Sequence, residues 1–198
     1  MESHTKSYVL FYKPYGVLSQ FTREAGYLSL ADFGPFPKNT YAAGRLDADS
    51  EGLLLLTNDN DIKHRITDPK FEHDRTYLVQ VEGFPDENDI ERLQKGIMIE
   101  GKRTKPAKAK MLTHEPHMPP RAVPIRFRKN VPTSWIELVL REGRNRQVKK
   151  MTAAVGHPTL RLVRTAIIFL PLNGLHPGEH RTLTSKEIKE MHKFLHLP

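Results

Sequence analysis

Four consecutive leucines, Leu53–Leu56, follow directly on an acidic turn, and this junction constrains the fold more than any other part of the chain. The apolar run is too short to span a membrane, and it lacks the polar alternation of a strand with one solvated face. It is therefore typical of a β-strand that is buried on both faces. The preceding segment, Gly44-Arg45-Leu46-Asp47-Ala48-Asp49-Ser50-Glu51-Gly52, is then a loop held against buried structure.

The residues alone leave this acidic loop open to more than one interpretation. The most ordinary is a solvated turn, in which Asp side chains bond the local backbone and Gly supplies permissive backbone angles. A second is a catalytic carboxylate at Asp47, preceded by an arginine, Arg45, that contacts an anionic substrate. The rest of the chain has to decide between them.

A calcium-binding loop is a third interpretation, and the spacing argues against it. The first half of an EF-hand loop is matched at positions one, three, five and six by Asp47, Asp49, Glu51 and Gly52. Position nine is then Leu55 and position twelve is Asn58, where the motif requires a bidentate Glu. We expect no calcium here.

The distribution of charge favours an anionic partner. The chain of 198 residues has a net charge of +8, but residues 102–164 contain sixteen Lys and Arg against three acidic residues, a local charge of +13. These cations are interleaved with strand-like apolar residues, which indicates a folded face rather than a basic tail. Such a face is typical of proteins that bind the phosphates of a polyanion.

Composition excludes several other classes. The chain has no cysteine, so disulfides and thiolate metal sites are absent. The amino terminus lacks a signal-peptide pattern, and we expect a cytoplasmic protein without a membrane partner. Two histidine pairs, His114 with His117 and His192 with His196, lack a third ligand and any HExxH pattern, so we expect no metal site.

Strand-like and helix-like segments are mixed without regular alternation. The clearest strands are Ser7–Tyr12, Arg75–Glu82, Trp135–Leu140 and Thr159–Thr165. The pattern predicts an α+β fold with a mixed, mostly antiparallel sheet, in two lobes around a basic cleft. The length fits one compact domain or two small lobes.

A helix is predicted to begin with Asn145 as its N-cap and to end at Gly156. At 100° per residue, its apolar face is formed by Val148, Met151 and Val155. The opposite face carries the cations Arg146, Lys149 and Lys150. We expect this helix to bury one side and to present positive charge on the other.

Four segments now stand in order: GRLDADSEGLLLLT (44–57), RTYLV (75–79), EGRNRQVKKM (142–151) and LRLVR (160–164). They resemble the RsuA/RluB/RluE/RluF family of ribosomal RNA pseudouridine synthases, and most of all its RluE branch. The resemblance implies a single catalytic domain over residues 1–198, with two lobes. Many relatives carry an N-terminal S4-type RNA-binding domain, which is not expected here because the strand SYVLFYKPYGVLS starts at once; the basic face is then expected to bind RNA unaided.

The resemblance also implies roles for individual residues. Asp47 matches the family's essential carboxylate, and Arg45 resembles the arginine that enters the RNA duplex beside the target. Lys149 aligns with the Arg or Lys that pairs with the catalytic aspartate, although lysine lacks the bidentate fork of arginine. The equal alternative for Lys149 is a phosphate contact on a solvated face. Contacts to the RNA backbone are expected from Arg144, Arg146, Lys150, Arg161 and Arg164.

Three further residues are expected to form the base pocket. Tyr77 resembles the tyrosine that packs on the uracil ring, and Val79 and Leu162 resemble residues that line the same pocket. The neighbouring carboxylates Asp49 and Glu51 are assigned to loop structure, because further negative charge facing the site would repel phosphate.

The implied reaction is isomerisation of a uridine in ribosomal RNA, with the large-subunit 23S rRNA as the expected substrate. The N1–C1′ bond breaks, the uracil rotates, and C5 bonds to the same sugar carbon. We expect no cofactor, because the sequence has no Gly-rich phosphate loop and no dinucleotide fingerprint. The residues leave three roles open for Asp47: attack on the sugar, attack on the base, or removal of a sugar proton.

A non-catalytic RNA-binding or ribosome-assembly protein is the main alternative. It would use the same basic face, and composition does not distinguish it from an enzyme. The GRLD segment disfavours it, since a phosphate binder gains nothing from a carboxylate among its cations. Either protein is expected to be a monomer.

Overall fold

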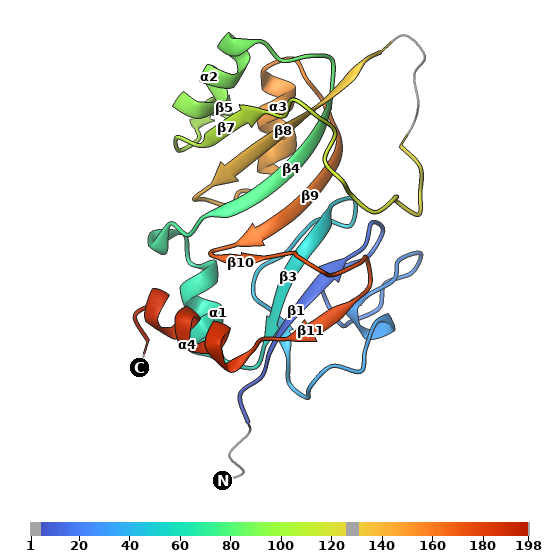
Figure 1. Ribbon diagram of the computed structural model, residues 1–198, viewed down its shortest axis with the longest axis vertical. Coiled ribbons are helices and arrows are strands. Elements are labelled where there is room, and N and C mark those ends of the chain that lie inside the picture. Colours follow the sequence, from blue (N-terminus) through green and yellow to red (C-terminus); the bar gives the residue numbers. More distant parts are fainter. Residues whose placement is uncertain (1–4, 126–130, 198) are drawn as a thin grey trace. The chain divides into compact units, whose positions relative to one another are not determined.

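The structure is a computed structural model that describes residues 5–125 and 131–197 (Figure 1). The chain forms two compact units, one of Met1–Phe71 with Phe169–Pro198 and one of Glu72–Ile168. Helices and strands are mixed in both units, and the strand pairs within each unit are antiparallel, which confirms the predicted α+β class. Within the described residues, no helix has the length and apolar character needed to cross a membrane.

The first unit is built around adjacent antiparallel strands in the order β11-β1-β3, with β2 also paired to β3. Its strands are β1 (Tyr8–Lys13), β2 (Tyr41–Ala42), β3 (Glu51–Thr57), β10 (Leu170–Pro171) and β11 (His180–Thr182). Its helices are α1 (Asn60–Thr67) and α4 (Ser185–Phe194), with 3-10 turns at Leu30–Asp32 and Pro69–Phe71.

The leucine run lies at the centre of this unit's core. Leu55 pairs with Leu10 and Leu54 with Phe11 across the β1–β3 ladder. All residues of β1 and β3 are buried, and Leu53–Leu56 have no exposed surface. The predicted strand with two buried faces is confirmed. Each leucine removed from water contributes about 1.5–3 kcal/mol, so burial of the run holds the strand in place and fixes where the preceding loop ends.

Glu187 links helix α4 to strand β11. Its carboxylate accepts two hydrogen bonds from the guanidinium of Arg181, at 2.7 and 2.9 Å. It also accepts from the backbone N–H of Thr184, the N-cap of α4, at 2.7 Å. The hydrogen bonds from Arg181, opposed by burial and helped by those from Thr184, lower the pKa of Glu187 to about 2.

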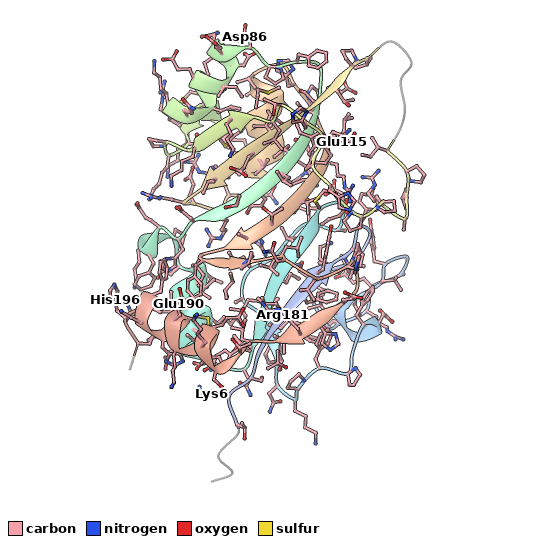
Figure 2. The ribbon with its side chains drawn as sticks, in the orientation of Figure 1. Lys6, Asp86, Glu115, Arg181, Glu190 and His196 are labelled. Carbon is pink, nitrogen blue, oxygen red and sulfur yellow. The ribbon has the colours of Figure 1, made fainter. Side chains whose placement is uncertain are left out.

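We expect Glu187→Gln to lower the free energy of unfolding by about 1–2 kcal/mol at pH 7, a value reduced for solvent screening. Because the folded-state pKa is depressed, the ionised carboxylate stabilises fully above its unfolded pKa of 4.5, and this contribution is lost as the pH falls toward 2. In denaturant titrations from pH 7 to pH 2, the free energies of unfolding of wild type and of Glu187→Gln should converge. Glu190→Gln, an exposed position on the same helix (Figure 2), is the control and should match wild type; a gap that stayed constant with pH would contradict the assignment.

The second unit is an antiparallel sheet in the order β9-β4-β8-β7, with helices α2 and α3 beside it (Figure 1). Its strands are β4 (Arg75–Glu82), β7 (Lys108–Met111), β8 (Thr133–Leu140) and β9 (Thr159–Ile167), with a short hairpin of β5 (Met98–Ile99) and β6 (Lys102–Arg103). Its helices are α2 (Glu87–Lys95) and α3 (Gln147–Ala154).

Helix α3 begins later than the sequence predicts. The predicted N-cap was Asn145, but the cap is Arg146, which has a left-handed backbone with φ of 50° and makes no side-chain cap hydrogen bond. The loop before the helix is instead fastened by Gln147, whose Oε1 accepts the backbone N–H of Arg144 at 2.9 Å. The predicted apolar face is confirmed, because Val148, Met151 and Val155 are all buried.

Candidate functional site

The acidic loop is pinned on both sides of Asp47. The hydroxyl of Ser19 donates to the carbonyl of Leu46 at 2.8 Å and accepts the N–H of Leu46 at 3.0 Å. The N–H of Gly16 donates to the carbonyl of Ala48 at 2.7 Å, and Gly16 reaches it with φ of +80°, which residues with a side chain rarely adopt. Asp47 therefore lies between two fixed residues, and its backbone has little freedom.

Lys13 adds a buried cation to this anchoring, a role that was not predicted from the sequence. Its side chain has no exposed surface, and its ammonium donates to the carbonyls of Pro14 and Val17 at 2.8 Å each and of Ala48 at 3.4 Å. Three carbonyls around one ammonium satisfy its donors, which offsets the cost of burying the charge. The available signal was a lysine at the end of a wholly apolar strand, directly before a proline.

We expect Lys13→Met to lower the free energy of unfolding by about 2 kcal/mol, because buried carbonyls lose their donor. The loop that carries Asp47 should also exchange its amide hydrogens faster, since Ala48 is released. Denaturant unfolding and hydrogen exchange measure the two effects. Lys189→Met, on the exposed surface of α4, is the control; equal stability of the two variants would show that Lys13 does not hold this loop.

The side chains of the loop differ in exposure. Asp47 is half-buried, whereas Arg45 is exposed and its guanidinium donates to Oε1 of Gln20 at 3.3 Å. Glu51, the first residue of β3, is only 2% exposed. The first unit thus holds Arg45 and Asp47 on one short, anchored loop, with a half-buried carboxylate and a cation that reaches solvent.

In the second unit, the residues predicted to form the base pocket lie together on one sheet face. Tyr77 and Val79 are two residues apart on β4, and Val79 pairs with Leu162 of β9. Directly paired residues of antiparallel strands point to the same face, with their Cβ atoms about 5 Å apart. All three side chains are buried, with Tyr77 8% exposed. This face offers an aromatic ring with apolar neighbours.

Arg164 lies on the same face and bonds the tyrosine. It pairs with Tyr77 across the β4–β9 ladder, and its guanidinium hydrogen-bonds the Tyr77 side chain. Burial lowers the pKa of Arg164, while its interaction with Tyr77 opposes that effect. Only 3% of Arg164 is exposed.

Arg161 lies on the opposite face of β9, where it pairs with Gln80. Its guanidinium donates to the carbonyl of Pro119 at 2.9 Å, and it is 7% exposed. Arg161 and Arg164 are both predicted from the sequence to contact the RNA backbone. In this structure both guanidinium groups are buried and bonded within the protein, and their expected contacts with the RNA backbone stay a prediction.

The EGRNRQ segment forms a compact network around Glu142, which was also not predicted from the sequence. The buried carboxylate accepts the N–H of Lys105 at 2.8 Å and Nε2 of Gln147 at 2.7 Å, and it pairs with Arg144 at 3.2 Å. Arg144 also donates to the carbonyls of Lys102 and Arg103, at 3.1 and 2.6 Å. The signal in the sequence was a glutamate and a glutamine five residues apart within a cationic motif.

This network bears on the expected roles of the cations. Arg144 is engaged with Glu142 and with backbone carbonyls, and its expected phosphate contact stays a prediction. Lys150 pairs with Glu100 at 2.7 Å. Arg146 is exposed and Lys149 is half-buried on the cationic side of α3. The predicted pair of Asp47 with Lys149 joins residues of different units and stays a prediction.

Each unit supplies one chemical element of the predicted site. The first holds a carboxylate on a rigid loop, which can act as a nucleophile or a base. The second holds an aromatic ring on an apolar sheet face, which can stack on a nucleobase. Among the described residues, no group of three or more His, Asp or Glu side chains is arranged to hold a metal ion.

Comparison with known proteins gives a consistent result at the level of sequence. Residues 7–154 match the family model described as RNA pseudouridylate synthase. The chain is 49% identical to ribosomal large subunit pseudouridine synthase E of Xanthomonas campestris pv. campestris, over 91% of this chain and 97% of that protein. It is 45% identical to the protein of the same name from Vibrio parahaemolyticus, over 92% and 76%. Ribosomal large subunit pseudouridine synthase B of Bacillus subtilis is 40% identical, over 96% and 73%.

Solved structures support the same family as the sequence comparisons. One described as a crystal structure of pseudouridylate synthase matches with a TM-score of 0.78 and 31% identity, over 96% of this chain and 76% of the other. The archaeal box H/ACA sRNP Nop10–Cbf5 complex contains a chain that matches with a TM-score of 0.53 and 13% identity, over 83% and 48%, a likeness of fold alone. The predicted pseudouridine synthase fold is confirmed.

Proposed function

Because the chain belongs to the RNA pseudouridylate synthase family, we propose that it converts a specific uridine of ribosomal RNA to pseudouridine, with 23S rRNA of the large subunit as substrate. The observation that carries this proposal is the 49% identity to a large-subunit synthase along 97% of that protein's length. The relatives from Vibrio parahaemolyticus and Bacillus subtilis, also named for the large subunit, support it.

Asp47 is the proposed catalytic residue. In the reaction the N1–C1′ bond breaks and a C5–C1′ bond forms, while the proton on C5 is lost and N1 gains one, so that substrate and product are isomers. A carboxylate can attack the sugar or the base, or take a proton from the sugar. The bonds that pin Leu46 and Ala48 support this role, because a fixed backbone keeps the carboxylate oriented for the reaction.

The target uridine has to leave its helix before Asp47 can act on it. Extruding a nucleotide costs roughly a few kcal/mol. We propose that Tyr77 stacks on the extruded uracil, with Val79 and Leu162 beside it, and that Arg45 fills the vacated space in the RNA. The exposed position of Arg45 supports its part, since only an accessible side chain can enter a duplex.

Lys149 is proposed to pair with Asp47 when RNA is bound and to keep it ionised. Its half-buried position on the cationic side of α3 supports a contact outside the core. We further propose that the protein acts as a monomer, without a cofactor, in the cytoplasm. The reaction changes no oxidation state and transfers no group to a second molecule, so the proposed residues suffice for it.

Arg146 is the proposed phosphate contact on α3. We expect Arg146→Ala to weaken binding to protein-free 23S rRNA severalfold and to reduce the slope of log K against log salt by about one. Filter binding at several salt concentrations gives both values. Arg92→Ala, whose guanidinium already bonds Asp89 and the carbonyl of Ala154, is the control and should leave the slope unchanged. An unchanged slope for Arg146→Ala would place the RNA contact elsewhere.

The proposed function is tested by mapping pseudouridines in ribosomal RNA from cells with and without this protein. One site in 23S rRNA should lose its modification in the deletion strain. The site should regain its pseudouridine when the wild-type gene is restored. An unchanged map would exclude the proposed activity in those cells, and loss of a site in another RNA would change the substrate.

A further inference from the structure

The first unit contains a pocket that the proposed reaction does not use. It has a volume of about 370 Å³ and lies between the segment around Phe21 and residues 31–41. Its walls include Phe21, Phe36, Pro37, Asn39, Thr40 and Tyr41. The volume is within the usual range of about 300–1,000 Å³ for small-molecule sites.

The walls of this pocket are aromatic. Phe21 meets Phe36 edge to face, with ring centroids 5.8 Å apart, and meets Tyr41 in the same way at 6.4 Å. Phe36 is further supported by Phe11 of the core strand β1, at 5.7 Å. Tyr41 is 56% exposed, although its neighbours hold it in place. An exposed ring in a supported cluster is a ready stacking surface for a flat ligand.

The charge around the pocket favours an anion. The lining residues, all within the described part of the chain, include no charged side chain. The ammonium of Lys63 lies 5.6 Å from the centre of the Tyr41 ring, and Lys38 is exposed between the lining residues Pro37 and Asn39. The nearby acid Asp32 is paired with Arg23 at 2.6 Å.

The pocket is linked to the acidic loop of Arg45 and Asp47 through one hydrogen bond. Gln20, which precedes Phe21, accepts the hydrogen bond from Arg45. Tyr41 begins β2, and the chain runs from it to Arg45 within four residues. The same short segment therefore carries the pocket's exposed ring and the arginine proposed to enter the RNA.

We propose that this pocket binds an unpaired nucleobase of the RNA substrate, distinct from the target uridine. The base stacks on Tyr41, its polar edge faces Asn39, and the adjoining phosphates meet Lys38 and Lys63. This rests on the proposed function for the identity of the RNA. Aromatic walls combined with flanking lysines are what a single-stranded nucleotide requires, whereas a peptide ligand would not need the cations.

The test measures affinity in an Asp47→Asn background, where bound RNA is not modified. The probe is protein-free 23S rRNA from cells that lack this protein. Tyr41→Ala should weaken binding about 5- to 160-fold, since stacking on one aromatic residue contributes about 1–3 kcal/mol per base. Tyr41→Phe, which keeps the ring, should bind within about twofold of the parent.

Tyr27→Ala is the matched control, because Tyr27 is 52% exposed in the same unit and does not line the pocket. A second measurement uses 23S rRNA transcribed with 4-thiouridine and crosslinked by light. Crosslinked peptides should include residues 21–41, and Tyr41→Ala should remove them. Affinity of Tyr41→Ala within twofold of the parent, an equal loss in Tyr27→Ala, or the absence of these crosslinks would overturn the proposal.

The two proposals fail separately. Pseudouridine formation is measured with the active wild type, whereas the pocket is tested with the Asp47→Asn protein. A modified site in wild-type cells together with unchanged affinity in Tyr41→Ala would reject the pocket alone. Weaker binding in Tyr41→Ala together with an unchanged pseudouridine map would reject the proposed reaction alone.

Discussion

Asp47→Asn is expected to lower the rate of pseudouridine formation by about 10⁴-fold or more, a loss of the size seen when an essential catalytic group is removed. Asparagine has nearly the same shape, so the loop should keep its bonds from Ser19 and Gly16. It has neither the charge nor the basicity of a carboxylate, and none of the three proposed roles for Asp47 survives. Affinity for ribosomal RNA should remain within about threefold of wild type.

The measurement is single-turnover modification of 23S rRNA, with pseudouridine read by chemical labelling and primer extension. Asp49→Asn is the matched control, since it removes the same charge from the same loop two residues away. It should retain activity within about tenfold. Wild-type rates in Asp47→Asn, or an equal loss in both variants, would show that the catalytic carboxylate is another residue.

Tyr77→Leu is expected to lower kcat/KM by about 100-fold, because the extruded uracil loses its stacking surface of about 1–3 kcal/mol and its alignment with Asp47. Leucine is apolar and fits among Val79 and Leu162, but it also removes the hydrogen-bond partner of the buried Arg164 guanidinium, so some loss of stability is expected as well. Steady-state kinetics on 23S rRNA separate the effect on kcat/KM from a loss of folded protein, which circular dichroism reports.

The structure predicts a different result for Tyr77→Phe. The ring stays, so kcat/KM should remain within about tenfold of wild type. The buried guanidinium of Arg164 loses a hydrogen-bond partner, which should lower the free energy of unfolding by about 1–3 kcal/mol. If Tyr77→Phe lost activity as severely as Tyr77→Leu while remaining stable, the hydroxyl would have a direct part in the reaction.

The strands and their faces were largely predictable from local pattern. The run Leu53–Leu56 has no polar alternation, and it is buried on both sides as expected. The apolar face of α3 also followed from its 3.6-residue period, since Val148, Met151 and Val155 are buried. These predictions succeed because periodicity records which side chains avoid water, and that preference is a property of each residue.

The roles of the cations were not predictable in the same way. Arg161 and Arg164 are three residues apart on a strand, so they face opposite sides of the sheet, yet both are buried. Their partners are the carbonyl of Pro119 and the side chain of Tyr77, 42 and 87 residues away in the chain. The charge of a segment is the same whether its cations bind phosphate or bind acceptors within the protein. Charge along the sequence therefore does not distinguish the two cases.

The sequence by itself determined the buried leucine strand, the acidic loop that precedes it and the family to which the chain belongs, because these depend on neighbouring residues. Only the tertiary structure decided what holds that loop and which cations remain accessible. Lys13 and Ser19 bond the backbone around Asp47 from more than 25 residues away, and the carbonyls of Lys102 and Arg103 accept from Arg144 across more than 40 residues. A charged side chain is buried when acceptors from distant segments converge on it, and local sequence contains no record of that convergence.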